Sequence, residues 1–176
     1  MTSLQRLLFC FLFVASAAAQ TAQQLPAIEG QSLAGNKVAL PDDAKGKITI
    51  LIFGFSRASK TATGAWADRI FADLGTQSRF ALYQLPVLES VPSFIRSMVI
   101  SSMKKGVREN MRDHFVPILT GEDELKKLVG FKESDDAYLV MLDSTGHILE
   151  QKHGPFSDAA YAQLRGDVQS QLGVQK

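Results

Sequence analysis

The sequence predicts an α/β protein, a three-layer α/β/α sandwich with helices on both faces of a sheet, and three observations support this class. Residues 48–55 are largely β-branched and aromatic, with no polar alternation except Thr49, which is typical of a strand covered on both faces. Residues 59–75 show apolar side chains at helical spacing, and residues 79–88 return to a strand-like run. A strand, a crossover helix and a second strand form a βαβ unit, so we expect the two strands to be parallel neighbours.

The first twenty residues differ from the rest of the chain. Arg6 supplies a positive start, residues 7–14 form an apolar block, and three alanines at 17–19 have the small-residue pattern of a signal-peptidase site. We therefore predict a signal peptide over residues 1–19 and an exported, periplasmic domain over residues 20–176. The alternative is a retained membrane anchor, but the apolar block is shorter than the roughly 20 residues that a spanning helix needs.

The bulk composition limits the function classes. A chain of 176 residues with 45% hydrophobic residues is long enough for one compact domain. Its single cysteine, Cys10, lies in the predicted signal peptide, so the exported domain has neither thiol nor disulfide. Removal of Arg6 leaves 18 basic residues of the original 19 against 18 acidic ones, and this balance gives no bulk electrostatic reason to bind nucleic acid.

Two hairpins and a closing helix surround the βαβ unit. Residues 25–41 contain two short apolar stretches around a tight turn at residues 34–36, which predicts an N-terminal β-hairpin. Residues 137–151 predict a second hairpin about a turn at residues 143–146. A last helix begins at Ser157 and has its apolar residues on one face.

The segment between the βαβ unit and the second hairpin contains shorter elements. Residues 115–119 are typical of a short extended segment. Thr120 and Asp123 indicate an N-cap ahead of a brief helix, and Gly130 indicates its end.

Residues 94–112, in a helix that Pro92 opens, form the most basic stretch of the chain. Its apolar face contains Phe94, Ile95, Met98, Val99, Ser102 and Met103, and its basic residues include Lys104, Lys105 and Arg108. One interpretation is ordinary packing of the apolar face on the sheet with an exposed basic end. The other is contact with a protein partner or an anionic membrane surface, because methionines adapt to varied partners and basic amphipathic helices bind anionic membranes.

Residues 53–63 read F-G-F-S-R-A-S-K-T-A-T and connect the first buried strand to its helix. This stretch resembles the strand-to-helix corner of Sco-type copper chaperones, whose pattern is F-G-F-T-x-C-P-x-x-C-P or has one more residue between the cysteines. On that pattern the first cysteine position falls on Ala58 and the second on Thr61 or Ala62. These residues supply no nucleophilic sulfur and no soft copper ligand, so we expect no redox activity and no cofactor.

The same corner is polar and cationic. Arg57, Ser59, Lys60 and Thr61 are candidate binding residues, because free N–H groups at a helix N-terminus can hold a carboxylate or phosphate. The other interpretation is that Ser59 or Thr61 caps the helix while Arg57 and Lys60 are solvated. The three histidines, His114, His147 and His153, suggest no metal site, because at most two could meet on one hairpin without a third ligand.

The order of elements resembles a thioredoxin-like domain of the peroxiredoxin and Sco type, with its added N-terminal hairpin and helical insertion. Residues 94–115, FIRSMVISSMKKGVRENMRDHF, and residues 120–164, which contain Y-L-V-M-L-D and G-H-I, further resemble the mitochondrial ATP synthase assembly factors and their bacterial relatives. Trp66 also falls where that family places a tryptophan.

Together these patterns predict an exported, redox-inactive thioredoxin-like binding protein. The resemblance implies an assembly factor or chaperone whose partner is a membrane-complex subunit, ATP synthase-like, with the membrane surface as a further contact. The alternative is a thioredoxin-like oxidoreductase or peroxiredoxin-type enzyme that uses a non-cysteine group or a borrowed thiol.

Overall fold

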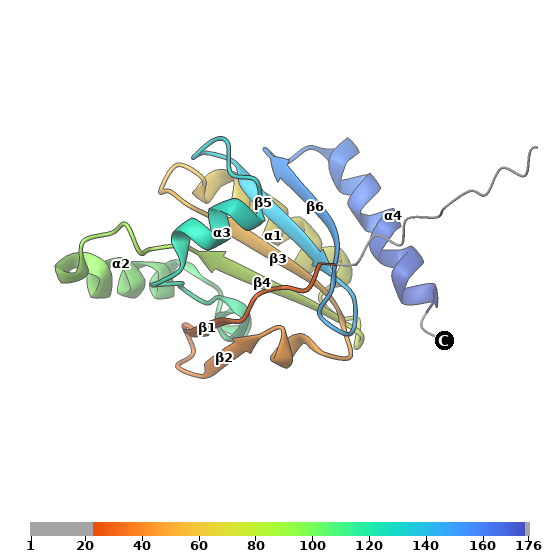
Figure 1. Cartoon of the computed structure of the whole chain (residues 1–176), viewed down its shortest axis with the longest axis horizontal. Helices are drawn as coiled ribbons and strands as arrows, with labels where there is room; N and C mark the ends of the chain where they lie inside the picture. The colour runs from red at the N-terminus through yellow and green to blue at the C-terminus, as the bar shows by residue number, and fades with distance from the viewer. Residues whose placement is uncertain (1–22, 175–176) are drawn as a thin grey trace, which may run out of the picture.

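A computed structural model describes residues 23–174 of the chain, and Figure 1 shows their arrangement. The signal peptide predicted over residues 1–19, with Cys10, lies outside the described residues. At the centre is a four-stranded sheet with the strand order β4-β3-β5-β6. Its strands are β3 (Ile48–Gly54), β4 (Phe80–Pro86), β5 (Ala137–Leu142) and β6 (Ile148–Gly154).

The predicted βαβ unit is confirmed. Strands β3 and β4 pair in parallel, from Ile48 opposite Phe80 to Gly54 opposite Pro86, and α1 (Lys60–Leu74) connects them. On its other side β3 pairs antiparallel with β5, and β5 pairs antiparallel with β6, which confirms the second predicted hairpin. Every residue of β3 is buried, and this position explains why its sequence lacks polar alternation.

The three predicted layers are present, with a hydrophobic core on each face of the sheet. Helices α1 and α4 pack on one face. The N-terminal hairpin β1-β2 and the short helix α3 cover the other face, which is nearer the viewer in Figure 1. The bounds are β1 Ile28–Gln31, β2 Lys37–Leu40, η1 Asp42–Ala44, α2 Ser93–Gly106, η2 Glu109–His114, α3 Glu122–Leu128 and α4 Asp158–Val174.

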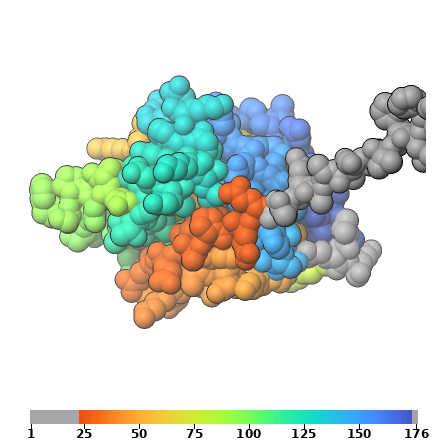
Figure 2. All heavy atoms as spheres, viewed as in Figure 1, coloured from red at the N-terminus to blue at the C-terminus, as the bar shows by residue number. Residues whose placement is uncertain are grey.

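The interpretation that the apolar face of helix α2 packs within the protein holds only in part: Ile95, Val99, Ile100 and Met103 are half-buried. None of its residues is buried, and Phe94 and Met98 are 84% and 65% exposed. The extended segment after it pairs with the edge of the sheet: the N–H groups of Val116 and Ile118 donate to the backbone oxygens of Gln84 and Pro86 at 2.8 and 2.9 Å. The extended segment is confirmed, and α2 protrudes from one end of the molecule (Figure 2).

The predicted cap of α3 by Thr120 and Asp123 is wrong. The N-cap position is Gly121, which has φ +81° and offers no side-chain cap. A carboxylate from elsewhere in the chain takes this role, because Glu89 Oε2 accepts from the Glu122 N–H at 2.6 Å. The end of the helix is as predicted, with Gly130 in a left-handed conformation at φ +60°.

Among the helices of the described residues, none combines the length and apolarity that crossing a bilayer requires.

Candidate functional site

The corner, residues 53–63, is organised by Ser56. Its Oγ accepts from the N–H groups of Ala58 and Ser59 at 3.0 and 3.2 Å and donates to the Ser134 carbonyl at 2.8 Å. Ser134 lies 78 residues later in the chain, in the loop before β5. The sequence signal for this turn is local, because a serine hydroxyl commonly accepts from backbone N–H groups two or three residues later.

The predicted capping of α1 by Ser59 or Thr61 is therefore wrong. Ser59 stands at the N-cap position, but its Oγ donates backwards to the Ser56 carbonyl at 2.9 Å, and the residue is 2% exposed. Gly54 is required for this arrangement, because a Cβ there would lie 2.6 Å from Ser59 Oγ. The first N–H groups of the turn are thus already satisfied within the protein.

The other predicted corner residues lie on the surface. Arg57, Lys60 and Thr61 are exposed, which confirms that Arg57 and Lys60 are solvated. Ala58, at the first cysteine position of the Sco pattern, is exposed as well. The corner therefore presents a methyl group where a thiol would stand in that pattern, and it keeps the surrounding turn.

An aromatic cluster fixes the loop opposite the corner. Tyr138 is fully buried, packs edge-to-face with Phe55 at 5.5 Å and stacks on Phe131 at 5.6 Å. Its hydroxyl accepts from the N–H groups of Lys132 and Glu133 at 2.8 and 2.9 Å and donates to the Glu133 carbonyl at 2.9 Å. Three hydrogen bonds from one buried hydroxyl hold this loop in a single position beneath the corner.

Helix α2, which we call the α2 arm (residues 93–106), makes its hydrogen bonds to the rest of the protein near its two ends. At its start, the Arg96 guanidinium donates to the carbonyls of Val91 and Glu89. Just past its end, Arg112 Nε donates to the Val107 carbonyl at 3.2 Å. The arm is therefore placed by hydrogen bonds at its ends together with the half-buried side chains of Ile95, Val99, Ile100 and Met103.

The exposed groups of the α2 arm are both apolar and cationic. Phe94 and Met98 are the two most exposed large apolar residues of the described chain. Lys104 and Lys105 lie exposed in the last turn, where positive charge also suits the helix dipole. The third predicted cation, Arg108, differs, because its guanidinium contacts Asp68 of α1 at 2.8 Å.

The structure does not bring the two predicted groups of site residues together. Within residues 23–174, no hydrogen bond or ion pair links the corner to Lys104, Lys105 or Arg108. The histidines are also separate: His153 pairs with Asp136 at 2.8 Å, whereas His114 packs against Tyr83. The candidate sites are therefore two, the corner and the α2 arm.

Comparisons with known proteins identify the fold. No protein-family model and no curated protein matches the sequence. Solved structures do match. BsSco, a member of the Sco family of cytochrome c oxidase assembly proteins, has a TM-score of 0.60 and 12% identity over 89% of this chain and 96% of that chain.

Two further structures come from thiol-dependent proteins. A thiol-disulfide oxidoreductase from Bacteroides fragilis has a TM-score of 0.59 and 16% identity over 82% of this chain and 98% of its own. The exposed lipoprotein thioredoxin Etrx1 of Streptococcus pneumoniae has a TM-score of 0.56 and 16% identity over 81% and 99%. The fold is thus thioredoxin-like, with the N-terminal hairpin, as predicted; identities this low show the fold alone.

Proposed function

We propose that this chain is an exported, redox-inactive thioredoxin-like protein that binds a protein partner and acts as an assembly factor or chaperone for a membrane complex. The observation that carries the proposal is the α2 arm, a 14-residue helix without a buried residue that exposes Phe94 and Met98. An isolated helix of this length is marginal in water, and most helices are stabilised by burying a face. One side of α2 is only half-buried, and its exposed apolar side chains, Phe94 and Met98, are expected to gain burial from a partner.

The chemistry of the arm defines the partner surface. Burial of a phenylalanine and a methionine contributes roughly 1.5–3 kcal/mol each. Lys104 and Lys105 add positive charge in the last turn of the same helix. The fitting partner is therefore a protein surface with an apolar groove and an acidic rim, which would steer association as well as hold the arm.

Two likenesses support an assembly role in particular. One solved structure with this fold belongs to a family of cytochrome c oxidase assembly proteins. The sequence over residues 94–164 resembles ATP synthase assembly factors, so an ATP synthase-like complex is the candidate target. The predicted signal peptide places this encounter in the periplasm, at the membrane surface.

The composition of the corner supports redox inactivity. Ala58 and Thr61 stand at the cysteine positions, and the sequence holds no cysteine after Cys10. We test this by insulin reduction with dithiothreitol as the electron donor. The wild-type domain should add nothing to the uncatalysed rate, and the Ala58→Cys, Thr61→Cys variant is the positive control for a competent corner. Catalysis by the wild-type domain alone or with a small thiol present would support the alternative, an oxidoreductase that borrows a thiol.

Partner binding is tested by crosslinking the tagged domain in membranes and recovering the adducts. Two variants disrupt the arm, Phe94→Ser with Met98→Ser and Lys104→Glu with Lys105→Glu. The matched control reverses two exposed lysines elsewhere, Lys127→Glu with Lys132→Glu.

We expect one membrane-complex subunit to be recovered with the wild type and the control and lost with both arm variants. Recovery that is unaffected by the arm variants but lost with Arg57→Ala would move the binding site to the corner. A binding assay with phosphatidylglycerol vesicles distinguishes a lipid contact from a protein contact. If the domain binds these vesicles through the arm without any other protein, the partner of the arm is the membrane surface.

A further inference from the structure

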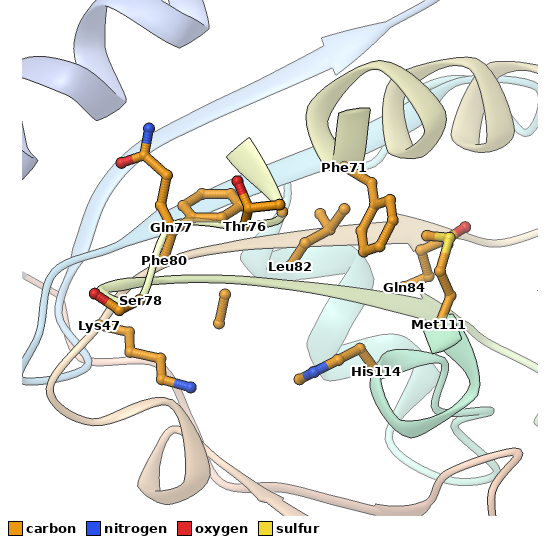
Figure 3. Close-up of a pocket in the computed structure, with 12 residues that line it drawn as sticks. Lys47, Phe71, Thr76, Gln77, Ser78, Phe80, Leu82, Gln84, Met111 and His114 are labelled. Carbon is orange, nitrogen blue, oxygen red and sulfur yellow. The ribbon is translucent and has the colours of Figure 1, made fainter. Parts of the chain in front are cut away.

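A cavity of about 290 Å³ opens at the outer edge of β4, between the end of α1 and η2 (Figure 3). It is separate from both the corner and the α2 arm. Both polar and apolar groups line its wall. Lys47 and His114 contribute nitrogen groups, and Phe71, Phe80, Leu82 and Met111 contribute apolar surface.

The cavity exists because β4 is only partly covered. The backbone oxygens of Gln84 and Pro86 point to the outer edge, where the segment at residues 115–118 pairs with them. Backbone groups alternate along a strand, so the N–H and C=O of Leu82 point to the same edge. Within the described residues, no segment pairs with Leu82 there. This half of the edge therefore offers an unused backbone donor to the cavity.

His114 supplies a second unused group. Its ring packs edge-on against Tyr83 with centroids 4.8 Å apart, and its Nδ1 is buried without a hydrogen-bond partner. Buried polar atoms of this kind are nearly always satisfied, by protein, water or a ligand. Burial, and then the nearby Lys47 charge, lower the pKa of His114, against a smaller opposing effect of Asp113. The imidazole is therefore neutral at pH 7, and one of its two ring nitrogens carries a proton that it can donate to an acceptor.

Lys47 faces this histidine from the opposite wall. Figure 3 shows its amine extended across the cavity toward the His114 ring. No carboxylate pairs with the amine within residues 23–174. The nearest acid to His114 in sequence, Asp113, is already used, since its Oδ1 accepts from Asn36 Nδ2 at 2.6 Å. Two nitrogen groups thus converge on a space without an anion of the protein's own.

We propose that this cavity binds a small organic acid, with its carboxylate between Lys47 and His114 and its hydrocarbon part against Phe71, Phe80 and Met111. Charge-assisted hydrogen bonds from an ammonium and an imidazole suit a carboxylate. The volume lies near the lower limit for ligand pockets, so the ligand is short. The site is independent of the proposed partner binding, because none of these residues belongs to the α2 arm.

The test is a titration of the domain with hexanoate, followed by NMR of the histidine side chains. The neutral isostere hexanamide is the matched probe, and His147 and His153 are internal references. We expect saturable shifts of the His114 resonances with hexanoate, a dissociation constant of about 1 mM or lower, and no such response to hexanamide. The two reference histidines should not move.

A pair of lysine variants tests whether the Lys47 ammonium binds the carboxylate of the ligand. Lys47→Gln should weaken hexanoate binding at least about tenfold, the loss expected when a charged donor is removed. Lys45→Gln, two residues away, should leave it unchanged, because Lys45 is exposed and pairs with Asp42 at 2.6 Å. Recovery of the membrane partner should be the same with either variant, so failure here is distinguishable from failure of the proposed function.

Three results would overturn the proposal. One is the absence of a His114 shift at about 10 mM hexanoate, a concentration that saturates any site of the expected strength. Another is an equal response to hexanoate and hexanamide, which would exclude recognition of the charge. The third is a shift with inorganic phosphate and none with hexanoate, which would exclude a ligand with a hydrocarbon part.

Discussion

The corner and the α2 arm are both exposed surfaces with cationic residues, but they differ in how many of their groups are already bonded or buried within the protein. At the corner, Ser56 makes three hydrogen bonds and Ser59 is almost completely buried. The α2 arm has no buried residue and leaves Phe94 and Met98 in solvent. In the Sco-type pattern that this corner resembles, the two cysteines stand at the corner. Here the hydroxyls of the corner are bonded within the protein, whereas the arm exposes apolar side chains, and for this reason we propose the arm as the binding surface.

This contrast predicts opposite consequences of mutation in the two regions. Substitutions around the corner should lower stability and spare partner binding. Substitutions on the arm should spare stability and abolish partner binding.

The largest expected effect is that of Tyr138→Phe beneath the corner. The change removes one hydroxyl and leaves two N–H groups and one carbonyl of the supporting loop without their partner. We expect a loss of about 2–3 kcal/mol in the free energy of unfolding, measured by urea denaturation. A loss below about 0.5 kcal/mol would show that the loop is not held by this hydroxyl.

Ser56→Ala should have the next largest effect. It removes the acceptor for the Ala58 and Ser59 N–H groups and the donor to Ser134, at a partly exposed position. We expect a loss of about 1–1.5 kcal/mol and faster hydrogen exchange of the Ala58 and Ser59 amides. The control is Ser56→Thr, which keeps the hydroxyl and should restore both values. An equal loss in Ser56→Thr would show that packing, not the hydroxyl, decides stability there.

The stability contributed by the Glu122 carboxylate, which accepts from the Ser90 N–H just before the arm, should depend on pH. Burial raises the pKa of the Glu122 carboxyl, but the hydrogen bonds from Lys126 and Ser90 and the Lys126 charge outweigh it, so the pKa is lowered from its ordinary 4.5. Because the folded pKa is below the unfolded one, this stabilisation is complete above about pH 4.5 and is lost as pH falls through the lowered value.

Glu122→Gln should therefore destabilise the protein by about 1 kcal/mol at pH 7, and the difference from wild type should shrink below pH 4.5. Urea denaturation at pH 7 and at pH 3 measures both values. Glu124→Gln, on the exposed side of the same helix, serves as the control. A difference that stays constant over this range would exclude the Glu122 charge as its cause.

The smallest effect on stability is expected for Phe94→Ser with Met98→Ser on the arm. Both side chains are mostly in solvent, so the free energy of unfolding should change by less than about 0.5 kcal/mol. Thermal denaturation checks this. A larger destabilisation would mean that the apolar side chains of the arm pack within the protein in solution.

The elements that the sequence predicts correctly depend on local patterns. The buried run at residues 48–55 and the helical spacing after it identify β3 and α1, and turn residues identify both hairpins. The contacts that were missed join distant residues. Ser56 and Ser134 are 78 positions apart, and Glu89 and Glu122 are 33 positions apart. A local pattern carries no information about such partners.

The α2 arm shows a second limit of sequence reasoning. An apolar face at helical spacing predicts that something covers it, without saying whether the cover belongs to the same chain. Here the protein covers half of that face, at Ile95, Val99 and Met103, and leaves Phe94 and Met98 exposed. Likewise, Lys47 and His114 share no motif, and only the fold brings them to one cavity.

The most direct test of the central claim places one photo-crosslinking amino acid at Met98 and, in a second variant, at Arg57. Both positions are exposed, so neither substitution should disturb the fold. We predict that irradiation of membranes yields a specific adduct with one membrane-complex subunit from Met98 and none from Arg57. An adduct from Arg57 alone would contradict the account and make the corner, not the α2 arm, the working surface of the protein.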